Sequence, residues 1–454
     1  MKNFLRPYRH ECMRRYCFWI YVLRSYTRYG LLFSVLCTSV GLWSAQMSPT
    51  TDITDPALGG WSPSLATNSS GNAIAVWTTF VTGLNVIQGS IFSGGSWSAP
   101  QTLSERDDVQ DPCVTMNDAG DAFAVWNCNS PTDSCVEACF FDHTSGLWGS
   151  AVDLTVPGVL AYFAKVKMNS AGDAIAVWEE QDTVGYPCIT MVSVYSKTTG
   201  TWAGPVALSV DPSASNPQVA MNDGGQAIVV WTSIESMGST IEASLYDNGT
   251  WSFCGDISPT DENADECRVG VDANGNCYTT WEAFTLYAGN FYRGAYYSYY
   301  LKIWLDSDIL VSSIPDPADF GFCMNPLSNT SGVCTTFDGS TYSIQVLAFI
   351  SGYLIGPMTV SSSGVNSRGV AIGMNNSNDI VVMWDTPENG RDQLAQYVGG
   401  QWSSPQDITD DQPEYSCLYL PRRCVNVNDK GQIVAVWEHF IGSQLYIGAS
   451  TGTL

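Results

Sequence analysis

The sequence predicts an all-β protein, a single β-propeller of about eight four-stranded blades. Three observations lead to this prediction: a motif recurs along most of the chain, one strand in each repeat is apolar on both faces, and residues near the N-terminus match a strand that the last repeat lacks. We expect residues 1–45 to be a signal peptide or N-terminal anchor and residues 46–454 to form the propeller domain.

The recurring motif is an Asn or Asp, two residues, a Gly, five residues and a Trp. In one copy Asn378 replaces the Gly, which indicates a turn with positive φ, because Asn tolerates that conformation best after Gly. A degraded copy ending at Phe337 brings the number of repeats to eight. The seven clean copies begin and end at Asn68 and Trp77, Asn117 and Trp126, Asn169 and Trp178, Asn222 and Trp231, Asp272 and Trp281, Asn375 and Trp384, and Asn428 and Trp437.

Each repeat predicts a four-stranded antiparallel meander, because β-prone runs flank the turn and two further runs follow it. The strand after the turn decides the fold. In the third copy Ala174, Ala176 and Trp178 point to one face. Ile175 and Val177 point to the other face. Since both faces are apolar, the sheet must be covered on both sides, and like sheets stacked around an axis are propeller blades.

The two ends of the domain predict closure of the ring. The last repeat ends near residues 445–449 without a fourth strand. Residues 46–55 resemble residues 401–410, which are the fourth strand of an earlier repeat. We therefore expect the N-terminal strand to complete the last blade, which also removes an exposed sheet edge. An open solenoid is the structural alternative.

The N-terminal segment predicts export. Basic residues are followed by an apolar run over residues 31–42 and then by small residues, which is typical of an export signal. The run is short for a membrane span, and no second apolar segment of spanning length follows. We expect a secreted or cell-envelope protein with no integral membrane domain beyond a retained N-terminal anchor.

Cysteine usage agrees with export. Twelve of the 15 cysteines follow residue 45, and an even number in an exported chain suggests disulfides. Our candidate pairs are Cys417 with Cys424 and Cys254 with Cys267, because each pair spans one predicted loop. The alternative is a set of small buried thiols. No Cys-x-x-Cys pair occurs, so we expect no metal site of the zinc-knuckle type.

Charge excludes one class of partner. After residue 45 the chain has 12 basic and 43 acidic residues, a formal charge of −31. Such a body repels nucleic acid and anionic lipid surfaces, so we expect no nucleic-acid partner. It attracts cations or basic partners, or the charge simply keeps the protein in solution.

The repeat consensus Asn-x-x-Gly-x-Ala-x-Ala-Val-Trp resembles that of exported bacterial tandem-repeat propeller proteins, most of them uncharacterised. The resemblance covers residues 46–454 and implies the fold. Kelch, WD40 and sialidase propellers are similar in architecture only, and the chain has no arginine cluster from which to carry over a sialidase site.

Two groups of residues are candidate ligand contacts. We expect them at the end of the ring where the second strand of each repeat ends. The alternatives are solvated charges at strand ends and tyrosines packed between blades. One group is the acidic residue after the repeat Trp, and the other lies in a tyrosine-rich stretch where exposed rings would stack on sugars or anchor proteins. The candidates are Glu179, Glu282, Asp385, Glu438, Tyr287 and Tyr292.

Catalytic signatures are scarce. After residue 45 the only histidines are His143 and His439, in different repeats, and no nucleophile elbow, metalloprotease helix or P-loop occurs. We expect no cofactor, with a divalent cation such as calcium as the candidate exception. Our hypothesis is a non-enzymatic binding module for a protein or glycan ligand. The alternatives are a carbohydrate-active hydrolase with paired carboxylates on the same face, and a structural component of the envelope.

Overall fold

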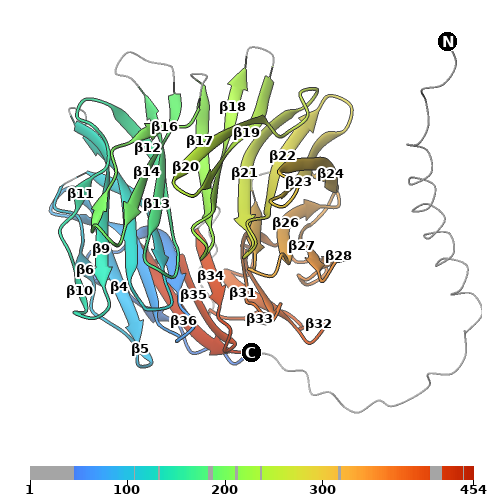
Figure 1. Cartoon of the computed structure of the whole chain (residues 1–454). Coiled ribbons are helices and arrows are strands. Elements are labelled where there is room, and N and C mark those ends of the chain that lie inside the picture. The colour runs from blue at the N-terminus through green and yellow to red at the C-terminus, as the bar shows by residue number, and fades with distance from the viewer. Residues whose placement is uncertain are drawn as a thin grey trace, which may run out of the picture. The chain divides into compact units, whose positions relative to one another are not determined.

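The computed structural model describes residues 45–454, except residues 107, 131–132, 182–187, 210–212, 236–237, 315–318, 410–421 and 443. Residues 1–44 of the expected leader therefore lie outside the described residues. The described chain forms eight antiparallel sheets arranged in a ring (Figure 1). No helix in this part of the chain is long and apolar enough to cross a membrane.

Each sheet is a meander of consecutive strands, and we number these blades 1–8 along the chain. In blades 1, 2, 3 and 7 the outer strand is split into two short segments. The strands of blades 1–4 are β2 (Trp61–Thr67), β3 (Ala73–Val81), β4 (Leu84–Ser93), β5 (Ser96–Trp97) and β6 (Gln101–Thr102); β7 (Val109–Met116), β8 (Ala122–Ser130), β9 (Asp133–Asp142), β10 (Leu147–Trp148) and β11 (Val152–Asp153); β12 (Leu160–Met168), β13 (Ala174–Gln181), β14 (Cys188–Ser196), β15 (Thr201–Trp202) and β16 (Val206–Ala207); and β17 (Ala214–Met221), β18 (Ala227–Glu235), β19 (Gly238–Asp247) and β20 (Thr250–Asp256).

The second half of the ring repeats this plan, with one exchange in the last blade, which takes its outer strand from the N-terminus. The strands of blades 5–8 are β21 (Asn263–Val271), β22 (Cys277–Thr285), β23 (Gly289–Ser298) and β24 (Ile303–Ile314); β25 (Phe320–Met324), β26 (Thr330–Phe337), β27 (Tyr342–Ile350) and β28 (Tyr353–Thr359); β29 (Arg368–Met374), β30 (Ile380–Thr386), β31 (Arg391–Val398), β32 (Gln401–Trp402) and β33 (Gln406–Asp407); and β34 (Arg423–Val427), β35 (Gln432–Ile441), β36 (Gln444–Thr453) and β1 (Thr51–Asp52).

The ring is closed by the N-terminal strand, which confirms the prediction from the two chain ends. β1 pairs antiparallel with β36, with Thr51 opposite Ala449. The backbone N–H of Ile53 donates to the carbonyl of Ile447 at 3.0 Å, and the Ile53 side chain is buried. The first strand of each blade contacts the first strand of the next, and β34 contacts β2, so these strands surround the axis without a gap.

Both faces of the second strand are buried between blades, as its sequence predicts. In β13 the small residues and Trp178 pack against blade 2, whereas Ile175 and Val177 pack against blade 4. The Trp of each of the seven clean repeats has no exposed surface. Burying a large ring on one face and branched residues on the other stabilises every blade only when both neighbours are present.

The repeat Asn builds the turn and also joins blades. The Asn428 side-chain oxygen accepts the N–H groups of Lys430 and Gln432, each at 3.0 Å. Its amide nitrogen donates to the carbonyl of Asn68 in the next blade at 3.2 Å. Asn378, which replaces the repeat Gly, has φ of 69°, so the expected positive φ is confirmed.

The degraded repeat is present as blade 6, but its anchor differs from the one expected at Phe337. The turn residue is Asn325, whose side chain accepts the N–H groups of Leu327 and Asn329, and Ser328 takes the positive φ. Counting nine residues from Asn325 places Cys334 at the Trp position. Phe337 is the nearest aromatic residue in the sequence, but the turn at Asn325 determines the register of this repeat.

Candidate functional site

The acidic residues that follow the repeat Trp are mostly buried. Glu179, Asp385 and Glu438 are at most 9% exposed, and Glu282 is half-buried in β22. They lie in four different blades, in strands β13, β22, β30 and β35. Their carboxylates therefore do not form an open acidic surface. Glu179, Asp385 and Glu438 are held in buried positions by a hydrogen bond or an ion pair to the next blade.

Backbone bulges account for two of these buried carboxylates. In six blades the first strand contains a bulge, and one residue there has positive φ. The N–H of Ser62, at such a bulge in blade 1, donates to Glu438 of blade 8 at 2.5 Å. The N–H of Asn216 in blade 4 donates to Glu179 of blade 3 at 3.4 Å. A bulge leaves a backbone donor without a ladder partner, and the carboxylate of the preceding blade satisfies it.

Asp385 belongs to a buried ion cluster between blades 7 and 8. The Arg423 Nε lies 2.6 Å from an oxygen of Asp392, and its Nη1 lies 3.6 Å from an oxygen of Asp385. The Arg423 side chain is 3% exposed. Burial raises the pKa of Asp385 to about 6, although the Arg423 charge opposes the shift. These ion pairs connect blades 7 and 8, and the buried side chains are not accessible to a substrate.

The two predicted tyrosines occupy different environments. Tyr287 lies in the turn between β22 and β23 and is fully exposed. Tyr292 lies in β23, is 1% exposed and stacks on Phe320 of blade 6 with ring centroids 4.3 Å apart. Most of the tyrosine-rich stretch is therefore a strand between blades, and only its first turn is available to a ligand at the loop end of the ring.

Tyr287 forms one wall of a groove that we call the loop groove. A volume of about 630 Å³ is enclosed by residues 238–240 of blade 4, by residues 260–263, which lead into the first strand of blade 5, and by residues 284–287. Phe284, Leu286 and Tyr287 contribute exposed apolar surface to the lining. Asp261 contributes an exposed carboxylate and Asn263 an exposed amide, whose oxygen accepts the N–H of Ser239 at 3.3 Å. The groove thus combines an aromatic wall with planar hydrogen-bonding groups.

Glu262 also lines the loop groove, but an ion pair holds its carboxylate. The Arg293 Nε lies 2.7 Å from a Glu262 oxygen, and the Glu262 side chain is 2% exposed. Burial raises the pKa of Glu262, and the Arg293 hydrogen bond and charge oppose that shift. Asp261 and Glu262 therefore do not make a pair of accessible carboxylates, which both routes of glycoside hydrolysis require.

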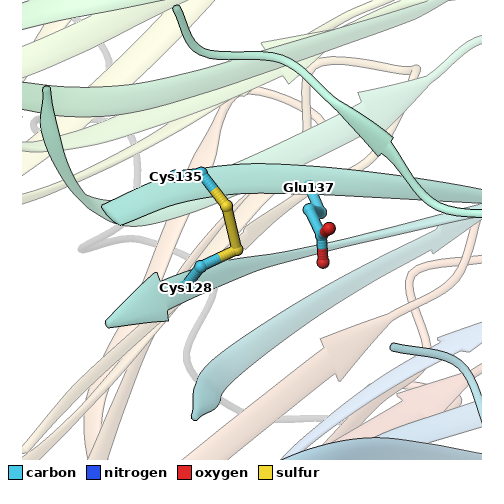
Figure 2. Close-up of side chains that lie close together, drawn as sticks. All are labelled: Cys128, Cys135 and Glu137. Atoms are coloured by element: carbon cyan, nitrogen blue, oxygen red, sulfur yellow. A yellow bond between two sulfur atoms is a disulfide. The ribbon is translucent and has the colours of Figure 1, made fainter. Parts of the chain in front are cut away.

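A disulfide that the sequence analysis missed joins Cys128 of β8 to Cys135 of β9 (Figure 2). The two residues are direct cross-strand partners with Cα atoms 4.8 Å apart. Glu137 lies beside them and accepts the indole N–H of Trp126 at 2.8 Å. Arg106 Nε lies 3.1 Å from the other Glu137 oxygen. Because the two sulfurs are bonded to each other, this group does not offer thiolate ligands to a metal.

We expect the double variant Cys128→Ala, Cys135→Ala to unfold with a free energy about 2–3 kcal/mol smaller than that of the parent. The disulfide closes a short loop, and removing it restores the conformational entropy of that loop in the unfolded chain. Urea denaturation monitored by Trp fluorescence measures the change. A reductant should destabilise the parent by a similar amount and leave the double variant unaffected. Equal stability of parent and variant would contradict the prediction.

The predicted disulfide between Cys254 and Cys267 is not formed, and both residues are free thiols. Cys254 lies on β20, the outermost strand of blade 4, and Cys267 lies on β21, the innermost strand of blade 5. A short sequence separation does not bring these positions together, since the connection crosses from the rim to the axis. Cys424 is a free thiol, and its expected partner Cys417 lies outside the described residues.

No protein-family model matches the chain, and no curated protein matches it. Among solved structures, it is similar to a protein of unknown function from Dyadobacter fermentans, with 10% identity, coverage of 90% of this chain and 99% of the other, and a TM-score of 0.46. It is also similar to an ulvan lyase of polysaccharide lyase family PL25, with 12% identity, coverage of 79% of this chain and 97% of the other, and a TM-score of 0.49. A third similar structure is an α-L-arabinanase from Penicillium chrysogenum, with 15% identity, coverage of 64% of this chain and 93% of the other, and a TM-score of 0.38. At these identities and TM-scores the likenesses carry no argument about function, and the propeller assignment rests on the sheet topology of this chain.

Proposed function

We propose that the protein is an exported, non-enzymatic binding module that holds a glycan in the loop groove. The observation that carries this proposal is the exposed Tyr287 ring, which faces a groove lined by hydroxyl, amide and carboxylate groups. Sugar rings present apolar C–H faces and a rim of hydroxyls. An aromatic wall beside planar hydrogen-bonding groups is complementary to both features.

The chemistry of the groove favours binding over hydrolysis. Glu262 is occupied by Arg293, which leaves Asp261 as the exposed carboxylate among the residues that line the groove. One exposed carboxylate is also far short of the six to eight oxygens that calcium prefers. We therefore expect glycan binding to persist in the presence of a chelator.

We expect Tyr287→Ala to weaken glycan binding by roughly 5- to 30-fold, which corresponds to about 1–2 kcal/mol for loss of one stacking ring. The measurement is a glycan array with the propeller domain, followed by calorimetric titration of the best ligand. Tyr300→Ala is the matched control, because Tyr300 is also highly exposed but lies in the turn between β23 and β24, at the other end of blade 5.

Three results would overturn the proposal. The array could give no ligand, the Tyr287 and Tyr300 variants could bind equally well, or the bound glycan could be cleaved on incubation. Cleavage that is lost in Asp261→Asn would point to the hydrolase alternative. Retention of a basic protein by the parent domain, with no glycan bound, would favour a protein ligand at this face.

A further inference from the structure

The interface between blades 5 and 6 lacks the ring that fills the other interfaces. In blade 4, Trp231 of β18 packs against blade 3 together with Ala227 and Val229. The matching positions of β26 in blade 6 are Thr330, Gly332 and Cys334. Among the described residues, the buried apolar core of this interface consists of Tyr292 and Cys334, whereas each of the other interfaces has nine or more buried residues.

The missing bulk leaves a cavity of about 720 Å³ between the two sheets, which we call the blade 5–6 cleft. Leu310 and Val311 of β24 line one wall, and Val346 and Leu347 of β27 line the other. No charged side chain is among the described residues that line it. A mostly apolar cavity of this size with a few polar groups matches the sites that proteins use for small organic molecules.

Ring contacts hold the two walls in place on the axial side. Tyr292 of blade 5 stacks on Phe320 of blade 6 at 4.3 Å, and Tyr278 stacks on Phe322 with centroids 5.9 Å apart. Gly294 makes room for the second contact, because a Cβ there would lie 2.6 Å from the Tyr278 hydroxyl. Since these rings bridge the sheets, the cleft is formed before a ligand arrives, which lowers the entropic cost of binding.

The cleft opens toward the outer edge of the ring. Leu305 of β24, Phe349 of β27 and Leu354 of β28 line it and are 44%, 44% and 63% exposed. At the opposite end Tyr292 and Cys334 are nearly inaccessible. An apolar molecule would therefore enter between the outer strands β24 and β28 and place its leading end against the buried floor.

One buried polar atom in the cleft has no partner. Thr280 of β22 lines the cleft and is 1% exposed, and its hydroxyl oxygen makes no hydrogen bond in the described structure. A buried hydroxyl without a partner is unfavourable, because it has given up its hydrogen bonds to water and gained none in the protein. A ligand with a hydroxyl, carbonyl or ether oxygen at its leading end would satisfy this group.

The surroundings of the cleft disfavour an anion. Burial is the main cause that raises the pKa of Tyr292 and of Tyr296. Nearby carboxylates add to it, Glu282 and Asp319 at Tyr292 and Asp272 at Tyr296, and the Arg268 charge opposes the shift at Tyr292. The same carboxylates repel a ligand carboxylate or sulfonate, and the apolar lining gives a cation no hydrogen-bonded counter-ion. We propose that the blade 5–6 cleft is a second binding site, for an uncharged and mainly hydrocarbon small molecule with one hydrogen-bonding group.

The test uses the neutral dye Nile red with the full propeller domain, and the anionic dye 8-anilinonaphthalene-1-sulfonate as the charge control. We expect saturable binding of one Nile red per chain and at least tenfold weaker binding of the anionic dye. Cys334→Trp restores the repeat residue and fills the cleft, so Nile red affinity should fall at least tenfold. Cys334→Ala leaves the cleft open and should bind within about threefold of the parent.

A second pair of variants keeps the test decisive if Cys334→Trp does not fold. Leu354→Arg places a charge at the exposed mouth and should also weaken Nile red binding at least tenfold. Leu147→Arg is its control, since Leu147 is 62% exposed in blade 2. Non-saturable dye binding, equal affinity in both members of each pair, or preference for the anionic dye would overturn the proposal. Glycan binding at the loop groove is measured separately and need not change in any of these variants.

Discussion

Replacing Arg423 by Met is expected to lower the free energy of unfolding by about 3–5 kcal/mol at neutral pH. Methionine keeps the length of the aliphatic stem but removes the charge that lies between Asp385 and Asp392. Two carboxylates would then remain buried between blades 7 and 8 without their ion-pair partner, and the Arg368 charge, which also acts on Asp385, makes no ion pair with either in the described structure. Removing one partner of a buried ion cluster is costly because the remaining charges stay desolvated.

The cost should depend on pH in a defined direction. Burial raises the pKa of Asp385 from 3.8 to about 6 in the folded protein, so its contribution to stability is largest below about pH 4 and is lost as the pH rises through 6. Burial also raises the pKa of Asp392. Without Arg423 both carboxyl groups should hold their protons to higher pH, and the variant should be more strongly destabilised at pH 8 than at pH 5.

Urea denaturation of the parent and of Arg423→Met at pH 5 and pH 8 measures both effects. Asp385→Asn in the Arg423→Met background is the control, because it removes one buried charge and should recover part of the stability at pH 8. The prediction fails if the variant loses less than about 1 kcal/mol, or if its loss is the same at the two pH values.

Deleting residues 1–55 is expected to destabilise the propeller by at least about 4 kcal/mol relative to a chain that begins at residue 45. The deletion removes the buried Ile53 side chain, worth about 1.5–3 kcal/mol. It also removes backbone hydrogen bonds such as Ser48 N–H to the Thr451 carbonyl at 2.7 Å, each worth about 1 kcal/mol. Beyond these losses, blade 8 would lose the strand that links it covalently to blade 1, and only the packing of these two blades would close the ring.

The same deletion should change the association state. Without β1 the outer edge of β36 presents unpaired N–H and C=O groups, which are a template for strands of other chains. We expect size-exclusion chromatography with light scattering to show dimers or larger species for the shorter chain and monomer-sized particles for the control. Equal urea midpoints and equal masses for the two chains would show that β1 does not hold the ring closed.

The repeat spacing determined most of the fold without any structural information. An Asn or Asp and a Trp nine residues later specify one hairpin, and seven such copies specify seven blades. Apolar residues on both faces of the second strand require a like sheet on each side, as the packing of Trp178 and Val177 against opposite neighbours confirms. The match between residues 46–55 and 401–410 was sufficient to predict that β1 completes blade 8.

Only the tertiary structure decided what individual polar and sulfur-containing residues do, because their partners lie on other blades or are set by the register of a hairpin. From its sequence position, Glu438 is expected to be an exposed acid at the end of a strand. In the structure it is buried and accepts the N–H of Ser62 of blade 1. Cys128 and Cys135 become a pair because the hairpin register puts them opposite each other. The loop groove and the blade 5–6 cleft depend on side chains that meet between neighbouring sheets. A repeat sequence specifies the shape of each sheet, whereas contacts between sheets depend on exact register and on which repeat departs from the consensus, as Cys334 does.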